Sequence, residues 1–540
     1  MKKRNVLQNS VIATVCIIIC KIIGLIYVIP FNAMISRSAG ALYSYAYNIY
    51  VIFLSLSTSG IPLAISKTVS EYNSLEYHNT EKRVYKIGTK LIFFMGLVCF
   101  VIMVLSADFM AKMVLGDTVG TNTVGDVASV IRVISLALLV VPVLSVTRGY
   151  LQGHKFIQES SISQVIEQIV RVLVILLGCI IVIKVLHLNE KIAINISVLS
   201  AAISAFVAYI YLKFKIKKNN LNKECVPTEV EKKISNKDVA KKILLCALPF
   251  IIIEVLKSAY SMVDTVTIVR GLTGLGYSIT DAEITFSVLA TWGNKLCTVV
   301  ISVSMGISMS LIPSVAGEYI KGNIDKVNEQ YNSSLLLLLI TTLPMTLGIF
   351  FLGQPIWILF YGYDYLSVEV FKLYIFQSIT YSLFSVLISF CQTINKTKVA
   401  LTSLFVSFIL NALFNIPAMH LCHHLGFGGY QGATVSTLVT QTIPCIFLLI
   451  YIKKKLNFNY NTLYKNTLKI IISNIVMMIV LYLVSIIYPV DSLNRLGSLF
   501  ECIVYVIIGG IVYVFMLIKT GLVNELFGNS RFLKRFKLVK

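Results

Sequence analysis

Long apolar stretches separated by polar connections dominate the hydrophobic pattern of this 540-residue chain. A helix needs roughly 20 consecutive apolar residues to cross the ~30 Å hydrocarbon core of a bilayer. We therefore predict an all-α integral membrane protein with about 14 transmembrane helices. The predicted spans are 10–35, 43–65, 87–107, 127–147, 163–184, 193–212, 242–268, 284–312, 334–352, 366–391, 399–419, 431–452, 467–488 and 497–518.

The longest polar connection lies between the sixth and seventh predicted spans. It covers residues 213–241 and carries nine Lys against four acidic residues. This hydrophilic segment predicts a chain divided into two lobes. The predicted parts are an N-lobe (1–212), a basic cytoplasmic linker (213–241), a C-lobe (242–452), two further helices (453–518) and a basic cytoplasmic tail (519–540).

Similar segments at matching places indicate that the two lobes are repeats. Residues 65–72 (ISKTVSEY) end the second span, and residues 312–319 (IPSVAGEY) end the eighth. Each segment follows a Gly-Ile pair, and each leads into a polar connection. Because six is an even number of spans, both lobes enter the membrane in the same direction. We therefore expect a pseudo-twofold axis along the membrane normal, with a cavity between the lobes.

The positive charges predict the orientation of these spans. Of 47 Lys and Arg, 35 fall in alternate connections or at the span ends beside them, and these connections begin with the N-terminus and end with the C-terminal tail. By the positive-inside rule those connections and both termini are cytoplasmic. The other connections, predicted to be outer, hold six cations: Arg37, Lys112, Lys184, Lys191, Arg270 and Arg495. The net charge of +22 fits loops facing anionic headgroups. No compact basic domain is present, so nucleic-acid binding is not expected.

The remaining six cations lie inside apolar stretches, where a charge is costly to keep and commonly marks function. They are Lys21, Arg132, Arg171, Lys257, Lys295 and Lys372. Several share a helix face with other polar residues at spacings of three and four. We interpret these faces as the lining of a substrate-binding cavity. The predicted cavity residues are Lys21, Glu167, Arg171, Glu254, Lys257, Asp264, Asn294, Lys295 and Asn411.

A structural interpretation of the same residues stays open. Polar side chains commonly hold membrane helices together without contacting a substrate. The pairs Glu167–Arg171 and Glu254–Lys257 have the spacing of ion pairs within one helix. Under this alternative the polar faces stabilise helix packing and line no cavity.

The sequence predicts neither a metal site nor enzymatic chemistry. His420, Cys422, His423 and His424 are close in sequence, but their spacing fits no structural zinc site. The eleven Cys are scattered and form no CxxC pair. No phosphate loop or hydrolase motif is present, which favours a transporter without ATP hydrolysis. We expect no cofactor, and coupling to the membrane potential, H⁺ or Na⁺ stays open.

One stretch resembles a known family. Residues 41–47 (ALYSYAY) and 56–67 (LSTSGIPLAISK) resemble the second helix of stage V sporulation protein B-like polysaccharide exporters. That group is similar to the MurJ-type lipid II flippases of the MOP superfamily. Lys21-Ile22-Ile23-Gly24-Leu25 fits the same pattern in the first helix. The resemblance implies alternating access and a lipid-linked sugar diphosphate as substrate. It also implies a groove for the lipid tail at the last two helices, and cations on the first two helices against the diphosphate.

The function expected from this resemblance is export of a polyprenyl-diphosphate-linked glycan precursor, lipid II of peptidoglycan, from the inner to the outer leaflet. Two alternatives stay open. One is a flippase for a teichoic, capsular or O-antigen lipid, and the other is a cation-coupled multidrug antiporter. We expect a monomer in the bacterial cytoplasmic membrane, with the lipid-linked anionic glycan and membrane lipids as its partners.

Overall fold

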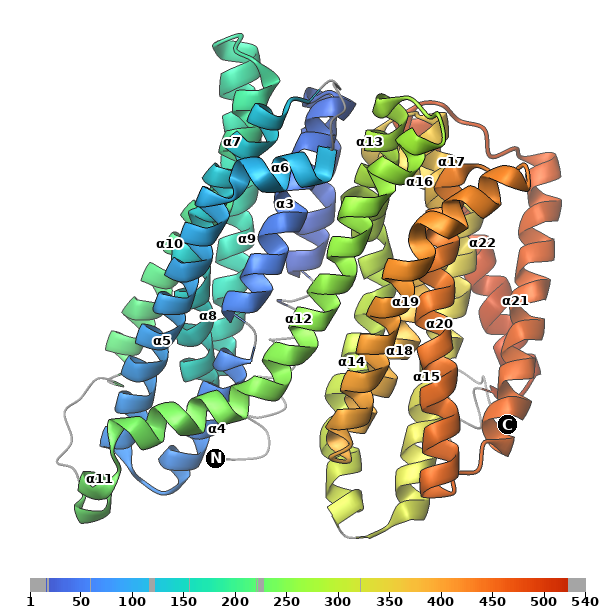
Figure 1. Ribbon diagram of the computed structural model, residues 1–540. Helices are drawn as coiled ribbons and strands as arrows, with labels where there is room; N and C mark the ends of the chain where they lie inside the picture. Colours follow the sequence, from blue (N-terminus) through green and yellow to red (C-terminus); the bar gives the residue numbers. More distant parts are fainter. Residues whose placement is uncertain are drawn as a thin grey trace. The chain divides into compact units, whose positions relative to one another are not determined.

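The computed structural model describes residues 16, 19–58, 60–115, 122–154, 156–219, 221, 228–320 and 322–522. Within these residues all regular secondary structure is helical (Figure 1). Twelve helical segments are long and apolar enough to cross a membrane, and each overlaps one predicted span. Of the other two predicted spans, the first is described as a short apolar helix, Ile19–Met34. The seventh, 242–268, lies within a 39-residue helix. The described part of the chain is therefore that of a multi-pass membrane protein.

Two compact units divide the chain at Ser287 and Val288, and unit 1 holds the N-terminal part. A long helix, α12, closes this unit by packing against α3, α4, α5 and α6. The elements of unit 1 are α2 (Val28–Met34), α3 (Arg37–Thr58), α4 (Ile61–Ser74), α5 (His78–Leu105), α6 (Ala107–Leu115), α7 (Val124–Ser135), α8 (Ala137–Gly153), α9 (Ile157–Cys179), the π-helix η1 (Ile180–Val185), α10 (Glu190–Lys218), α11 (Glu229–Lys233), α12 (Asn236–Gly274) and α13 (Ile279–Ser287).

Unit 2 holds the remaining helices, of which α19 and α20 pack against each other along their length. The last two helices, α21 and α22, pack on α15 and α16 of the same unit. The elements of unit 2 are the π-helix η2 (Val288–Trp292), α14 (Gly293–Ile320), α15 (Ile324–Phe351), α16 (Gly353–Tyr361), α17 (Tyr365–Tyr374), α18 (Gln377–Thr393), α19 (Thr397–His424), α20 (Gly429–Leu456), α21 (Asn461–Ile487) and α22 (Arg495–Lys519).

The second predicted span, 43–65, is not one continuous helix. It is divided into α3 and α4 at Gly60, whose φ of 77° is a conformation that side-chain-bearing residues rarely adopt. Pro62 lies at the start of α4, where its missing N–H leaves no helical hydrogen bond unmade. The Gly-Ile-Pro motif that carried the family resemblance is therefore a helix break. The predicted connection 66–86 is correspondingly helical over most of its length.

The two units share an order of elements. In unit 1 the long helix α5 is followed by the short helix α6 and by a span broken into α7 and α8. In unit 2 the long helix α15 is followed by the short helix α16 and by a span broken into α17 and α18. The next two helices are long in both units, α9 and α10 against α19 and α20. This parallel supports the internal repeat predicted from the sequence.

The predicted linker 213–241 is partly helical, since it contains the end of α10, all of α11 and the start of α12. Glu231 of α11 holds this segment on unit 1, because its Oε1 accepts hydrogen bonds from the backbone N–H groups of Asn79 (3.0 Å) and Thr80 (2.9 Å). Arg83 of α5 donates from Nη2 to the carbonyl of Ile234 (2.7 Å). The boundary between the two six-helix lobes stays a prediction, since the compact units meet further along the chain.

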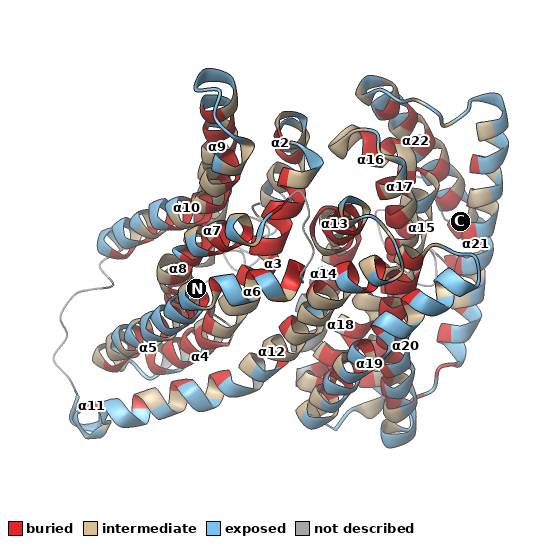
Figure 2. Cartoon of the chain, turned by 45° about the horizontal axis from the view of Figure 1, so that its top comes forward, coloured by how far each residue is buried: buried red, intermediate tan, exposed pale blue. Residues whose placement is uncertain are grey.

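Many large apolar side chains are exposed on both units. Exposed residues are pale blue in Figure 2. In unit 1 they include Phe94 on α5 and Phe214 on α10, which are mainly exposed. In unit 2 Ile487 on α21 and Phe515 on α22 are exposed in the same way. Such contiguous apolar surface is stable against lipid and would be unfavourable in water. By contrast α3 is largely buried, as its red ribbon in Figure 2 shows.

Candidate functional site

Three charged side chains form a network between α8 and α9 of unit 1, which we call the arginine cluster: Arg148, Glu167 and Arg171. Arg171 Nη2 lies 2.6 Å from Glu167 Oε1, and Arg148 Nη2 lies 2.8 Å from Glu167 Oε2. Each guanidinium therefore binds a different oxygen of one carboxylate. The side chains of Arg148, Glu167 and Arg171 are 17%, 13% and 25% exposed. Because two guanidinium groups share one carboxylate, the largely buried arginine cluster carries a net positive charge.

Arg148 is a site residue that the sequence analysis missed. The sequence places it at the start of the predicted inner connection 148–162, but it lies within α8, which continues to Gly153. Its Nε donates to Ser163 Oγ of α9 at 2.8 Å. Two contacts to one neighbouring helix hold the guanidinium in place. The signal available in the sequence was the 15-residue separation of Arg148 from the polar face of α9, which is short enough for adjacent antiparallel helices.

A row of tyrosines on α3 faces the arginine cluster. Tyr43, Tyr47 and Tyr50 each interact electrostatically with Arg171. The rings of Tyr43 and Tyr47 are stacked with centroids 5.5 Å apart, and those of Tyr47 and Tyr50 are 6.1 Å apart. Their spacing of four and three residues places them on one face of α3. An aromatic face beside guanidinium groups can contact both the cations and the ring of a sugar.

Lys21 lies on the first helix, which packs on α9 beside the arginine cluster. A Cβ added at Gly24 would lie 3.0 Å from Gln168 Nε2, so the two helices are in close contact there. Cys20 interacts electrostatically with Arg148 and Glu167. Lys21 itself is exposed. The structure therefore places the first helix, with its predicted cation, next to the cluster on α9.

The predicted residues of α12 also belong to unit 1. Glu254 and Lys257 form the ion pair that their spacing predicted, with 2.8 Å between Oε1 and Nζ. Both side chains are about one-third exposed. Asp264 lies further along α12 and is partly buried. Since α12 packs against α3, α4 and α5, these groups form a second polar region of unit 1.

The last three predicted residues lie in unit 2. Lys295 Nζ lies 4.4 Å from the centre of the Trp292 ring, a cation–π contact. Asn294 precedes it on α14 and is partly buried. Asn411 on α19 is fully buried. The structure thus places six predicted residues in unit 1 and three in unit 2, and a single cavity lined by all nine stays a prediction.

The polar face of α19 is a helix-packing surface. Ser403, Ser407, Asn411 and Asn415 all lie on it, and all are buried. Ser407 Oγ donates to the carbonyl of Thr440 on α20 at 2.9 Å. Ser407 therefore takes part in helix packing, as in the structural interpretation. The assignment of Asn411 to a cavity stays a prediction.

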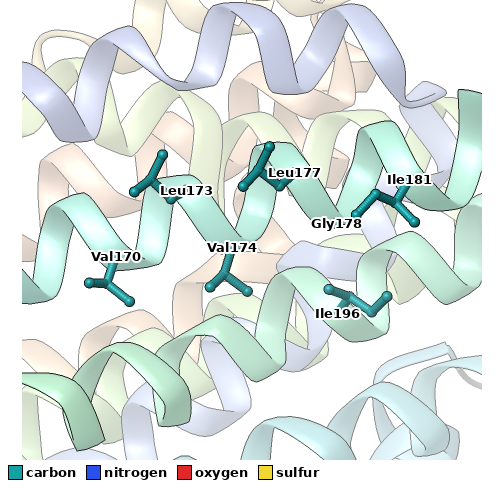
Figure 3. A pocket seen from close by; sticks show the side chains of 7 residues that line it. All are labelled: Val170, Leu173, Val174, Leu177, Gly178, Ile181 and Ile196. Atoms are coloured by element: carbon teal, nitrogen blue, oxygen red, sulfur yellow. The ribbon is translucent and has the colours of Figure 1, made fainter.

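Two apolar grooves lie on the units, and neither contains a charged side chain. The larger, about 600 Å³, lies between α15 and α21 and is lined by residues such as Leu347, Phe351 and Ile475. The smaller, about 380 Å³, lies between α9 and α10. Figure 3 shows its carbon-only lining, from Val170 to Ile181 on one side and Ile196 on the other. Both grooves suit acyl or polyprenyl chains.

Comparison with known proteins gives the class of this chain. A family model described as polysaccharide biosynthesis protein matches residues 6–278, and one described as MatE matches residues 289–416. The two models meet close to the boundary between units 1 and 2. The chain belongs to the polysaccharide biosynthesis protein family.

Individual relatives agree with this class. The chain is 29% identical over 534 residues to the lipid II flippase MurJ of Bacillus subtilis (strain 168), with 97% of each chain covered. It is 24% identical to stage V sporulation protein B of the same organism over 172 residues, about 32% of each chain. The resemblance to the MurJ-like branch of the MOP superfamily is confirmed.

Solved structures show the same fold. A lipid II flippase MurJ in an inward closed conformation matches with a TM-score of 0.69 at 16% identity, over 95% of this chain and 99% of that chain. An inward-facing MATE family transporter of the MOP superfamily matches with a TM-score of 0.65 at 12% identity, over 84% and 99%. By their names these relatives are transporters or flippases, and the two-lobed architecture predicted from the sequence is the fold they share.

Proposed function

We propose that this protein is a flippase that moves a polyprenyl-diphosphate-linked glycan precursor, lipid II of peptidoglycan, from the inner to the outer leaflet by alternating access. The observation that carries this proposal is the arginine cluster, which places two guanidinium groups around one carboxylate in a membrane-spanning unit. The full-length similarity to a lipid II flippase supports the same substrate class.

The chemistry of the arginine cluster suits a diphosphate. A guanidinium presents paired N–H donors that match the oxygens of a phosphate, and such charge-assisted hydrogen bonds are among the stronger ones in proteins. Arg171 Nε is buried and has no hydrogen-bond partner among the described residues, so this donor is unsatisfied in the absence of a ligand. Glu167 keeps both guanidiniums in position when no substrate is bound. It also competes with the substrate, which allows release.

The apolar groove between α15 and α21 supplies a place for the lipid carrier. Its lining is mainly hydrocarbon, and its polar side chains are Asn474 and Tyr482. The amide of Asn474 donates within its own helix to the carbonyl of Ile470 (2.9 Å). A prenyl chain that moves from the bilayer into this groove exchanges lipid contacts for protein contacts, so van der Waals packing rather than the hydrophobic effect holds it there. The resemblance places the tail groove at the last two helices, and α21 is one of them.

Transport needs a source of free energy. An inside-negative membrane potential favours outward movement of an anion by about 2.3 kcal/mol per charge per 100 mV. A diphosphate carries more than one negative charge, so the membrane potential alone can drive export. Coupling to H⁺ or Na⁺ is the alternative that we retain.

A second candidate is a multidrug antiporter, which the match to the MatE model favours. Such a protein would bind organic cations at buried acids. The arginine cluster opposes this function, because its excess positive charge repels a cationic drug. A flippase for another lipid-linked polysaccharide is a closer candidate, since the same diphosphate chemistry applies.

Genetic replacement tests the proposal. The essential lipid II flippase of a bacterial host is depleted while this protein is supplied in its place at normal expression. Growth with the wild-type chain, and loss of growth with Arg148→Ala or Arg171→Ala, would support export of lipid II. Arg132→Ala is the matched control, because Arg132 pairs with Asp108 on an exposed surface. Death of the host despite good membrane expression would contradict lipid II as substrate.

A further inference from the structure

Glu283 is a buried carboxylate that the proposed transport mechanism does not use. It lies on α13 in unit 1 and is 2% exposed. Asn122 Nδ2 donates to its Oε2 at 3.3 Å, and the same amide donates to the carbonyl of Ser38 at 3.1 Å. Its other oxygen, Oε1, has no hydrogen-bond partner among the described residues.

The surroundings of Glu283 come from three connections that the charge pattern places on the outer side. Ser38 follows the first span, Asn122 lies between the third and fourth spans, and Glu283 lies before the eighth. The side chain of Asn122 therefore links Ser38 to Glu283, and it joins the predicted outer ends of three segments that are far apart in the sequence. The protonation of the Glu283 carboxyl can therefore depend on whether those ends are packed together.

Tyr45 of α3 completes the site. Its fully buried hydroxyl lies close to Glu283 and interacts with it electrostatically. The ring of Tyr45 stacks on Phe286 of α13 with centroids 4.7 Å apart. This apolar contact seals the carboxyl group between α3 and α13.

Among the described residues, no positive charge forms an ion pair with Glu283. The helices packed on α13 are α3 and α12. The charged groups at their nearest ends are Arg37 on α3 and Arg270 on α12, whose guanidinium contacts the backbone of Lys112 on α6, and α13 itself carries Asp281. Arg37, Lys112 and Arg270 are exposed, and none of the four forms an ion pair with Glu283. An ionised carboxylate without a cation is strongly disfavoured in a buried site, whereas the neutral acid is tolerated.

We propose that Glu283 is a proton-binding site whose occupancy controls the packing of α13 against α3. The carboxylate takes up one proton from water on the predicted outer side and becomes a neutral acid as the two helices pack. Separation of α13 from α3 exposes the group to water, and the proton returns there. The packed arrangement is therefore favoured by acid outside the cell. This inference does not depend on which substrate the protein carries.

Hydrogen–deuterium exchange of the full-length protein in lipid nanodiscs tests the proposal. After correction for the intrinsic pH dependence of exchange, opening of residues 279–287 in the wild type should rise with pH by up to about tenfold per pH unit, as expected for one linked proton. Glu283→Gln keeps the size of the side chain but cannot titrate, so its corrected exchange should not vary with pH. Asp281→Asn removes a charge two residues away and should keep the wild-type dependence.

Infrared spectroscopy gives a direct readout of the proton. The wild-type protein should show a protonated carboxyl C=O band that is missing in Glu283→Gln. The proposal is overturned if this band is unchanged in Glu283→Gln, or if that variant keeps the wild-type pH dependence of exchange. Should Glu283→Gln not fold, Glu283→Asp retains a titratable group, and the proposal then requires a one-proton dependence with a displaced midpoint. A wild type whose corrected exchange is independent of pH would also overturn it.

Discussion

Two polar faces with the same spacing, one on α9 and one on α19, have different surroundings in the structure. On α9 the face carries Glu167 and Arg171, which remain partly exposed and bind a second arginine from α8. On α19 the face carries Ser407 and Asn411, which are both buried, and Ser407 donates to the backbone of α20. From the sequence, both faces were predicted to line one cavity.

The difference shows what the spacing of polar residues can establish. A period of three to four residues places side chains on one helix face, but it does not state what covers that face. Neutral groups such as Ser and Asn can satisfy their hydrogen bonds against a neighbouring backbone, so they pack well. Arginine retains donors and charge after pairing, so an excess of arginine marks a place suited to a ligand.

The largest effect that would test this comparison is loss of transport when the arginine cluster is broken. We expect Arg171→Ala and Arg148→Ala each to reduce the flipping rate by about ten- to hundredfold, since a hydrogen bond to a charged group contributes about 1.5–3 kcal/mol. Flipping is measured in vesicles with a fluorescent lipid-linked diphosphate sugar. Arg132→Ala serves as the control, and an unchanged rate in both cluster variants would remove the cluster from this role.

A smaller effect, on stability alone, is expected where α19 and α20 touch. A Cβ added at Gly432 would lie 2.4 Å from the carbonyl oxygen of Ala418, which is backbone and cannot move aside easily. We expect Gly432→Ala to destabilise the protein by up to about 3 kcal/mol through overpacking. Gly510→Ala is the control, because nothing lies within 4 Å of its added Cβ. Thermal unfolding in detergent measures both, and equal stability would show that the contact is loose.

Asn411→Ala separates a packing role from a binding role for the face on α19. Loss of a buried hydrogen-bonding group should lower stability by about 1 kcal/mol. Substrate affinity should not change. Thr402→Ala, at an exposed position of the same helix, should alter neither property. A strong loss of substrate affinity in Asn411→Ala, with stability unchanged, would instead support the prediction that this face of α19 lines the substrate cavity.

The smallest expected effect is on the local stability of the linker segment that Glu231 holds on unit 1. Burial alone would raise the pKa of Glu231, but hydrogen bonds from the backbone of Thr228 and Thr80 outweigh it and lower the pKa below its ordinary value. Its stabilisation is therefore present above the ordinary carboxyl pKa of about 4 and is lost as the pH falls through the lowered value. Glu231→Gln removes the carboxylate charge, so it should remove the same stabilisation at neutral pH.

Hydrogen exchange of residues 228–242 checks this prediction. Amides of this segment should exchange faster in Glu231→Gln, while global stability changes by less than about 0.5 kcal/mol. Glu229→Gln is the matched control, because Glu229 is exposed and pairs with Lys232 on the same helix. Equal protection in the wild type and Glu231→Gln would show that this carboxylate does not hold the linker.

Much of the fold was predictable because hydrophobic length is a strong signal. The twelve candidate spans coincide with predicted ones, and the ion pairs Glu167–Arg171 and Glu254–Lys257 follow from helical spacing. The break at Gly60 was not predicted, since an apolar run of sufficient length gives no indication of a left-handed residue inside it. The short helices α6 and α16 were missed because they lie in the predicted outer connections and are too short to span a membrane.

The candidate site was only partly predictable. Glu167 and Arg171 were identified because charges are rare inside apolar stretches. Arg148 and Glu283 were missed for one shared reason, since each lies at the end of a span, where a charge is ordinary and carries no signal. Their importance comes from burial and from contacts with other segments of the chain, which only the tertiary structure supplies.

Direct binding of a lipid diphosphate is the measurement that most directly tests the central claim. Purified full-length protein in nanodiscs is titrated with a polyprenyl diphosphate, and with the corresponding monophosphate for comparison. We predict that the wild type and Asn411→Ala bind the diphosphate equally and prefer it to the monophosphate. Arg148→Ala and Arg171→Ala should each lose at least about tenfold in affinity. Wild-type affinity in both arginine variants would contradict the assignment of the arginine cluster as the diphosphate site.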